Sequence, residues 1–123
     1  MTSALSKCPF DAKSLLHRCM GDAGFCELML QKFADRAANQ LAALERAARA
    51  ANCVELAREA HTLKGIALNL SADELRASAT RLEQAARTGQ CDCLGELISE
   101  VRVQVIRCLE SMPWVLAEIA ERR

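Results

Sequence analysis

Apolar residues return every three to four positions along almost the whole chain, and this spacing predicts helices. Between Asp22 and about Ala51 the pattern follows one helical face, at Phe25, Leu28, Met29, Phe33, Ala37, Leu41, Leu44 and Ala48. Hydrophobic residues make up 51% of the chain and aromatic residues only 3%, which is typical of an aliphatic helical core. Strand signals are absent, so we expect an all-α fold.

Capping residues, glycines and a proline divide this pattern into separate helices. The segments Asn52–Glu55 and Ser71–Glu74 resemble capping boxes, and Pro113 is expected to kink or interrupt the last helix. The predicted helices are 11–20, 22–51, 52–70, 71–88 and 92–112, with a final turn or short extension over 114–123.

The predicted helices are joined by connections of only a few residues, which favours antiparallel neighbours. We therefore expect an all-α, antiparallel up-down four-helix bundle with a short additional N-terminal helix on one end. A length of 123 residues suits one domain with one core. The expected organisation is a flexible leader over residues 1–10 and a single bundle domain over residues 11–123.

The charge balance argues against several classes of partner. Sixteen basic and sixteen acidic residues cancel, so no net field attracts nucleic acid or an anionic membrane. No apolar run approaches the roughly 20 residues that span a bilayer, and the N-terminus lacks a signal-peptide pattern. We expect a cytoplasmic protein with no nucleic-acid binding and no membrane insertion.

The seven cysteines do not form a predicted metal site. Their number is odd, and Cys91-Asp92-Cys93 is the only close pair. A metal-binding bundle would place glutamate three residues before histidine, whereas Ser14 precedes His17 and Arg58 precedes His61 at that spacing. We expect no metal or cofactor in this chain, and cysteines that are mostly buried or inert thiols.

His61 is the candidate reactive residue. Gly65 lies at i+4 on the same predicted helix face and removes side-chain bulk beside the imidazole. A glycine in a helix interior costs roughly 1 kcal/mol relative to alanine, so its presence requires a reason. Lys64, at i+3, adds a cation. An uncrowded imidazole beside a positive charge suits a histidine that receives an anionic group such as a phosphoryl group.

The predicted helix around His61 has two faces. Its core seam is Leu56, Ala60, Leu63, Ala67 and Leu70. His61 lies about 100° around the helix from Ala60, off this seam. The face of His61 also holds a candidate partner-docking patch, made of Val54, Ala57, Arg58 and Leu68. The charged segments 45–49 and 81–87 are predicted to be solvated helix faces.

The segment Ala60-His61-Thr62-Leu63-Lys64-Gly65 resembles the signature of histidine-containing phosphotransfer (HPt) domains, the four-helix modules of multistep two-component relays. Further similarity lies at Leu15-Leu16, Gly21-Asp22, Phe33, Asn69-Leu70, Leu75 and Leu82-Glu83. The resemblance covers most of the chain up to about Thr88, and the final helix is similar only in length and amphipathicity.

This resemblance implies a role for each residue of the signature. His61 would be the phospho-acceptor, Lys64 would neutralise and orient the phosphoryl group, and Gly65 would keep the ring accessible. Two departures concern partner choice: Ile66 and Leu68 are bulky where the family usually has small residues, and Ser71 replaces a common turn glycine. Ser71 is also a suitable N-cap.

The resemblance also implies the partners. A neutral imidazole nitrogen, Nε2 by the resemblance, would attack an aspartyl phosphate on a response-regulator receiver domain. The receiver would supply Mg²⁺, so this chain needs no cofactor of its own. The group would pass reversibly to a second receiver, with a hybrid sensor histidine kinase upstream. The chain would be a phosphocarrier rather than an autonomous enzyme, and a monomer suffices because each bundle has one accessible histidine.

Two other functions remain open at this point. A phosphorylation-independent helical adaptor, or inactive relative, is the main alternative, and it would bind partners without accepting phosphate. A histidine-kinase dimerisation domain is disfavoured, because its histidine is typically followed by an acidic residue, then an arginine and a proline. Here Thr62 and Lys64 follow the histidine instead.

Overall fold

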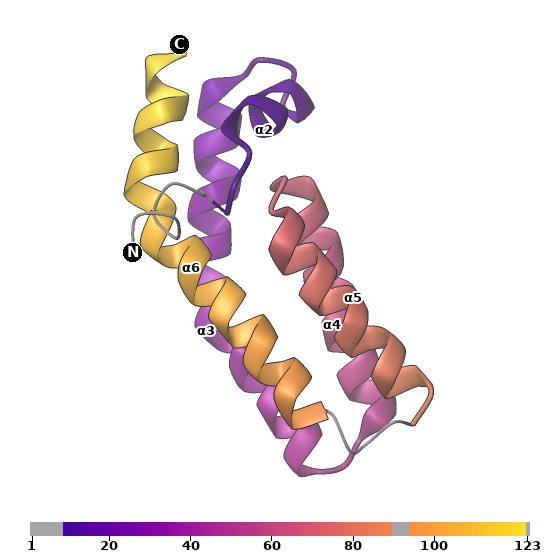
Figure 1. Cartoon of the computed structure of the whole chain (residues 1–123). Helices are drawn as coiled ribbons and strands as arrows, with labels where there is room; N and C mark the ends of the chain where they lie inside the picture. Colours follow the sequence, from indigo (N-terminus) through magenta and orange to yellow (C-terminus); the bar gives the residue numbers. More distant parts are fainter. Residues whose placement is uncertain (1–8, 90–93, 123) are drawn as a thin grey trace.

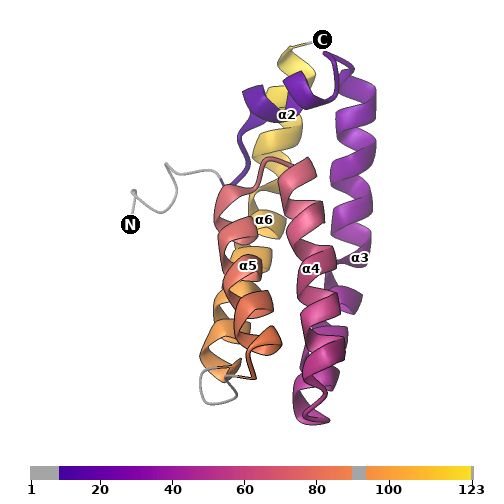
Figure 2. The same ribbon diagram turned by 90° about the vertical axis from the view of Figure 1, so that its right-hand side faces the viewer.

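The computed structural model describes residues 9–89 and 94–122. Within these ranges the chain is all α-helical and has no strand, as predicted. Four long helices alternate in direction, and the short α2 lies at one end of the bundle (Figures 1 and 2). The helices are α2 Ala12–Arg18, α3 Ala23–Arg49, α4 Cys53–Asn69, α5 Asp73–Arg87 and α6 Leu94–Glu121.

The pairing of α4 with α5 is the most extensive helix contact in the described structure. The predicted seam of α4 is buried throughout, and so is the α5 stripe of Leu75, Ala79, Leu82 and Ala86. Both stripes alternate leucine with alanine, so bulky side chains of one helix fit over small ones of the other. Figure 2 shows the two helices side by side.

The core face of α3 agrees with the predicted stripe at Phe33, Ala37 and Leu44, which are buried, and differs from it near the start of the helix. Phe25 and Leu28 are 49% and 51% exposed, although the sequence pattern placed them on the buried stripe. The buried face is Ala23, Cys26, Leu30, Phe33, Ala37, Leu44 and Ala47. Alanines occur on every side of this helix, and Cys26 occupies a core position, so spacing alone does not determine which way the helix faces.

The first described residues belong to the folded domain, which corrects the predicted leader over 1–10. Phe10 is 3% exposed and packs edge-on against Phe33, with ring centroids 6.2 Å apart. The Asp11 N–H donates to the Ser71 carbonyl oxygen at 3.1 Å. Residues 1–8 lie outside the described residues, so the leader prediction is wrong at least at Phe10.

Three helices end in the same way, with a non-glycine residue in the left-handed conformation. Met20, Ala51 and Ser71 have φ angles of 57°, 53° and 55°. After α4, the Ser71 N–H donates to the Leu68 carbonyl and the Ala72 N–H to the Ala67 carbonyl, which is the Schellman pattern. Such turns favour glycine, because other L-residues lose roughly 1–2 kcal/mol in this conformation.

The two predicted capping boxes have different outcomes. Asn52 caps α4 as expected, because its side-chain oxygen accepts from the Glu55 N–H at 3.1 Å. The prediction for Ser71 is wrong: the N-cap of α5 is Ala72, which has no side-chain hydrogen bond. The Ser71 hydroxyl instead bonds to the Ser14 hydroxyl at 3.0 Å and accepts from Arg18 Nε at 3.2 Å. These bonds tie α2 to the end of α4.

Of the two outcomes predicted for Pro113, a kink or an interruption, the interruption is absent, because helix α6 continues through the proline. Proline removes one backbone donor, but Val115 and Ile119 beyond it are fully buried and hold the last turns on the core. Figure 1 shows one helix that changes direction between its orange and yellow parts. The predicted start at Asp92 lies outside the described residues, and the described helix begins at Leu94.

The described cysteines are packing residues. Cys19, Cys26 and Cys108 are buried, and Cys53 is partly buried. Burial, together with the neighbouring Cys19, raises the pKa of the Cys26 thiol to about 12, so this thiol stays protonated. Among the described residues there is no group of metal-ligating side chains, and no described helix has the length and apolarity to cross a membrane. Cys8, Cys91 and Cys93 lie outside the described residues.

The left-handed turn after α3 generates a stability prediction. Ala51→Gly relieves the positive φ at an exposed site and is expected to raise the free energy of unfolding by about 0.5–1 kcal/mol. The adjacent Ala50→Gly is the matched control: Ala50 has a negative φ of −82°, so this change is expected to lower stability by a similar amount. Urea unfolding of both variants measures the difference, and equal shifts would contradict the explanation.

Candidate functional site

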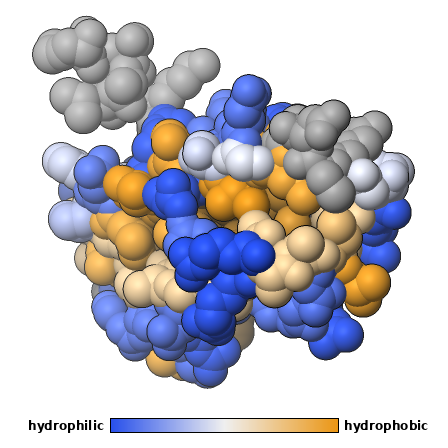
Figure 3. Space-filling model, turned by 90° about the horizontal axis from the view of Figure 1, so that it is seen from below, coloured by the Kyte–Doolittle hydropathy of each residue, from blue (hydrophilic) through white to orange (hydrophobic). Residues whose placement is uncertain are grey.

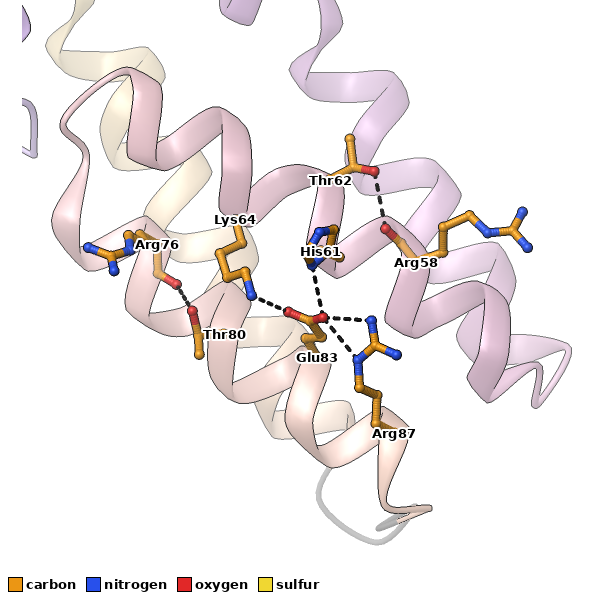
Figure 4. A network of polar contacts seen from close by, with 8 residues as sticks. All are labelled: Arg58, His61, Thr62, Lys64, Arg76, Thr80, Glu83 and Arg87. Carbon is orange, nitrogen blue, oxygen red and sulfur yellow. Dashed lines mark hydrogen bonds and ion pairs between the residues drawn. The ribbon is translucent and has the colours of Figure 1, made fainter. Parts of the chain in front are cut away.

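His61 lies in the middle of α4, on the flank that faces α5 (Figure 4). Its side chain is 61% exposed, so the ring is open to a partner. Ring atom Nδ1 is turned inward and lies 3.0 Å from Oε2 of Glu83, a residue of α5. Nδ1 of the imidazole is therefore held by the protein, and Nε2 is left open to a partner.

Glu83 is the centre of the polar network, and its side chain is only 7% exposed. Lys64 Nζ lies 2.8 Å from Oε1, and the Arg87 guanidinium donates twice to Oε2, at 3.0 and 2.8 Å. With His61, three side chains from two helices meet one carboxylate (Figure 4). The carboxylate thus joins α4 to α5 at the height of the candidate histidine.

The carboxylate of Glu83 is ionised at neutral pH. Burial raises its pKa, but hydrogen bonds from Lys64, Arg87 and His61 outweigh burial and lower the pKa to about 2. An ionised carboxylate accepts hydrogen bonds and cannot donate them. We therefore assign the proton of the neutral imidazole to Nδ1, which leaves the lone pair on Nε2.

The sequence builds this site through helix spacing. Glu83 lies four residues after Ala79 and three before Ala86, so it shares the buried stripe of α5. Alanine on either side leaves room for the charged groups that cross from α4. Lys64, three residues after His61, reaches the same carboxylate, and Arg87 pairs with Glu83 at the favourable i, i+4 spacing.

The prediction of a solvated face over 81–87 is wrong at Glu83. Arg81 does lie at the surface, where it pairs with Glu100 of α6 at 2.9 Å. Glu83 is buried, and the sequence analysis missed it and Arg87 as site residues. The signal was available: a glutamate inside an otherwise apolar stripe requires cationic partners.

Gly65 has no packing role within the described structure. A Cβ atom at this position would meet no heavy atom within 4 Å beyond its chain neighbours and the backbone of its own helix. Alanine would therefore fit in the isolated chain, and it would also favour the helix by roughly 1 kcal/mol. The space beside the His61 ring is left open toward the outside of the bundle.

Three of the four predicted docking residues lie at the surface. Val54 and Leu68 are 75% and 37% exposed. Arg58 is exposed as well and pairs with Glu55 at 3.0 Å, pointing away from Glu83 (Figure 4). Ala57 is a correction, because it is 4% exposed and belongs to the core. Its side chain is enclosed in the core one turn before Ala60, so it cannot contact a partner.

The family of this chain follows from a comparison with known protein families. A family model described as Hpt domain matches residues 28–113, which run from early α3 to Pro113 in α6. The chain belongs to the Hpt domain family, whose members are phosphocarriers of phosphorelays rather than enzymes. No curated protein and no solved structure matches the chain.

The Glu83 network generates a pH-dependent stability prediction. A carboxyl pKa that is lowered from 4.5 to about 2 on folding stabilises the protein fully above pH 4.5, and this contribution is lost as the pH falls toward 2. The difference in unfolding free energy between wild type and Glu83→Gln is expected to shrink by up to about 3 kcal/mol between pH 6 and pH 2. Urea unfolding at several pH values measures it.

The control for this experiment is Glu100→Gln, which removes a carboxylate from the exposed pair with Arg81. Its effect is expected to change by less than about 1 kcal/mol over the same pH range, because solvent screens surface pairs. A difference for Glu83→Gln that stays constant with pH would contradict the ionised, buried carboxylate.

Proposed function

We propose that this chain is a histidine phosphotransfer protein that accepts a phosphoryl group on His61 from a receiver-domain aspartyl phosphate and passes it to another receiver aspartate. One observation carries the proposal: His61 is 61% exposed while its Nδ1 is held by a buried carboxylate. This arrangement supports a nucleophile at Nε2 that requires no base within the chain. The membership of the Hpt domain family supports the same assignment.

The attack needs little from this chain beyond position and charge. The Nε2 lone pair approaches phosphorus in line with the bond to the aspartate oxygen, and the two proteins hold that geometry. The receiver contributes Mg²⁺, which neutralises charge on the phosphoryl oxygens. The fixed Nδ1 proton keeps the ring in one tautomer and one orientation, so the lone pair is ready before the partner arrives.

Lys64 supplies the cation nearest to the reacting ring in this proposal. Its side chain is 31% exposed and ends 2.8 Å from Glu83, so it is ordered yet close to solvent. A lysine ammonium is a compact charge on a flexible stem. It can keep its bond to Glu83 or turn toward phosphoryl oxygens on Nε2.

The docking surface that we propose consists of Val54, Arg58 and Leu68, together with the open space at Gly65. Exposed apolar groups next to a reactive side chain are typical of a binding site. Leu68 lies two turns from His61 along this face, so its bulk selects among receivers. Ile66 is partly buried against the core, beside Met29 and Phe33 of α3.

The proposed partners are response-regulator receiver domains and an upstream hybrid sensor histidine kinase, all in the cytoplasm. A monomer is sufficient, because one bundle carries the exposed His61 together with the Lys64, Glu83 and Arg87 side chains that meet beside it. Nucleic acid and membranes have no place in the proposal, since the sixteen basic and sixteen acidic residues cancel.

Transfer from a panel of Mg²⁺-loaded, radiolabelled receiver domains tests the proposal. Wild type is expected to gain acid-labile label, and His61→Gln is expected to gain none. Lys64→Ala is expected to slow the transfer about tenfold, because a charge-assisted contact to the phosphoryl group is lost. Lys32→Ala is the matched control, since this exposed lysine lies on α3, and its rate is expected to stay unchanged.

Each outcome of this panel has a definite meaning. Label that persists in His61→Gln would place the acceptor elsewhere. Receivers that bind the chain without transferring label would favour the adaptor function over the carrier function. Circular dichroism of each variant separates a loss of reactivity from a loss of fold.

Gly65 yields a prediction that separates stability from activity. Gly65→Ala is expected to raise the unfolding free energy by roughly 1 kcal/mol, yet to slow phosphotransfer, because its methyl group fills space needed by the partner. Gly95→Ala in the first turn of α6 is the control: a Cβ there also meets nothing within 4 Å, and transfer is expected to be unchanged. Equal transfer rates for both variants would remove Gly65 from the site.

A further inference from the structure

We propose that the Glu83 carboxylate keeps Nδ1 protonated while the phosphoryl group is attached, so that His61 carries phosphate as a phosphoimidazolium poised for transfer rather than storage. This inference rests on the proposed function and concerns the chemical state of the carrier. Glu83 is then a positioning residue that sets how long the phosphoryl group stays on the ring.

The geometry places a fixed negative charge at the ring atom opposite the reacting one. Glu83 Oε2 lies 3.0 Å from Nδ1, and the carboxylate is almost completely buried. The Arg87 guanidinium donates twice to this same Oε2, at 3.0 and 2.8 Å, and Lys64 pairs with Oε1. Arg87 therefore keeps Oε2 beside the ring when the charge on the ring changes, even if Lys64 turns toward the phosphoryl group.

The transfer step balances without any proton leaving the ring. The Nε2 lone pair forms the N–P bond, the P–O bond to the receiver aspartate breaks, and its electron pair stays on the aspartate as a carboxylate. The imidazole was neutral with its proton on Nδ1, so it becomes a cation that still holds that proton. In the next transfer a carboxylate oxygen of the second receiver's aspartate forms the new P–O bond, the N–P bond breaks, its electron pair returns to Nε2, and a neutral imidazole departs.

Loss of the Nδ1 proton would change this balance. A bare Nδ1 lone pair would face the Glu83 oxygen at 3.0 Å, where two acceptors repel each other. The ring would also have to depart as an anion, which is a poor leaving group. The carboxylate opposes this state, and a neutral amide in its place would tolerate it, because an amide can also donate.

The charges around Glu83 allow an anion to approach His61 although the carboxylate itself is negative. The charged groups that meet Glu83 are His61 and Lys64 from α4 and Arg87 from α5. The two permanent cations exceed the single carboxylate, so the cluster remains net positive even with a neutral imidazole. The phosphoryl group thus approaches a positive site despite the glutamate.

The test uses the full chain, labelled with ¹⁵N and phosphorylated with phosphoramidate, a small donor that needs no receiver. NMR of the phosphorylated ring follows the pH at which Nδ1 loses its proton, and the decay of the phosphoprotein at pH 8 gives its lifetime. Glu83→Gln is expected to prolong the lifetime about fivefold, because a charge-assisted hydrogen bond is roughly twice as strong as a neutral one. In this variant, Nδ1 is expected to lose its proton at a pH about 0.7 unit lower than in wild type, because a fivefold change in an equilibrium constant corresponds to about 0.7 pH unit.

Glu100→Gln is the matched control and is expected to behave as wild type in both measurements. An equal or shorter lifetime for Glu83→Gln, with Nδ1 titrating as in wild type, would overturn this inference alone. If neither phosphoramidate nor any receiver labels His61, the proposed function fails together with it. If the variant does not fold, the titration of Nδ1 in phosphorylated wild type still tests the inference. An Nδ1 that is already deprotonated at pH 7 would overturn it.

Discussion

The buried carboxylate of Glu83 is the interaction on which the site depends. Helices α4 and α5 pack through alternating leucines and alanines, and this close approach leaves a charged group in the interface with little access to water. A buried charge without partners is strongly destabilising, so Lys64 and Arg87 are required as well as His61. The same pairing that holds two helices together therefore fixes the tautomer and the direction of an exposed ring. Stability and chemistry share one residue, and neither can be altered there without the other.

The features that could be predicted from the sequence follow from periodicity. The all-α class, the buried seam of α4 and the cap at Asn52 all depend on local spacing, and each is confirmed. The predicted stripe of α3 is confirmed at Phe33, Ala37 and Leu44 but is wrong at Phe25 and Leu28, because alanine is compatible with both core and surface and spacing alone does not fix which way the first turns face. The continuity of α6 through Pro113 depends on the packing of residues beyond the proline. Local helix propensity contains no information on that packing.

The residues of the candidate site also divide into those that local spacing predicts and those that it does not. His61, Lys64 and Gly65 lie within five residues of one another, so their proximity was evident from one helical turn. Glu83 is 22 residues from His61, and only the packing of two helices brings them to 3.0 Å. Ala57 illustrates the opposite error: it shares a helical flank with His61 in projection, yet a neighbouring helix covers it. A helical wheel shows in which direction each side chain points, but it does not show which of these directions a neighbouring helix covers.

The hydroxyl of Ser71 has a consequence for the axial register of the helices. It bonds to Ser14 and Arg18, so the end of α4 is anchored to α2 while its middle is joined to α5. A helix rises about 1.5 Å per residue, and a hydrogen bond of 3.0 Å does not survive a displacement of that size. Sliding α4 by a single residue would break both attachments together. The short helix α2, at the far end of the bundle, therefore fixes the axial position of α4 and keeps the His61 ring beside the Glu83 carboxylate.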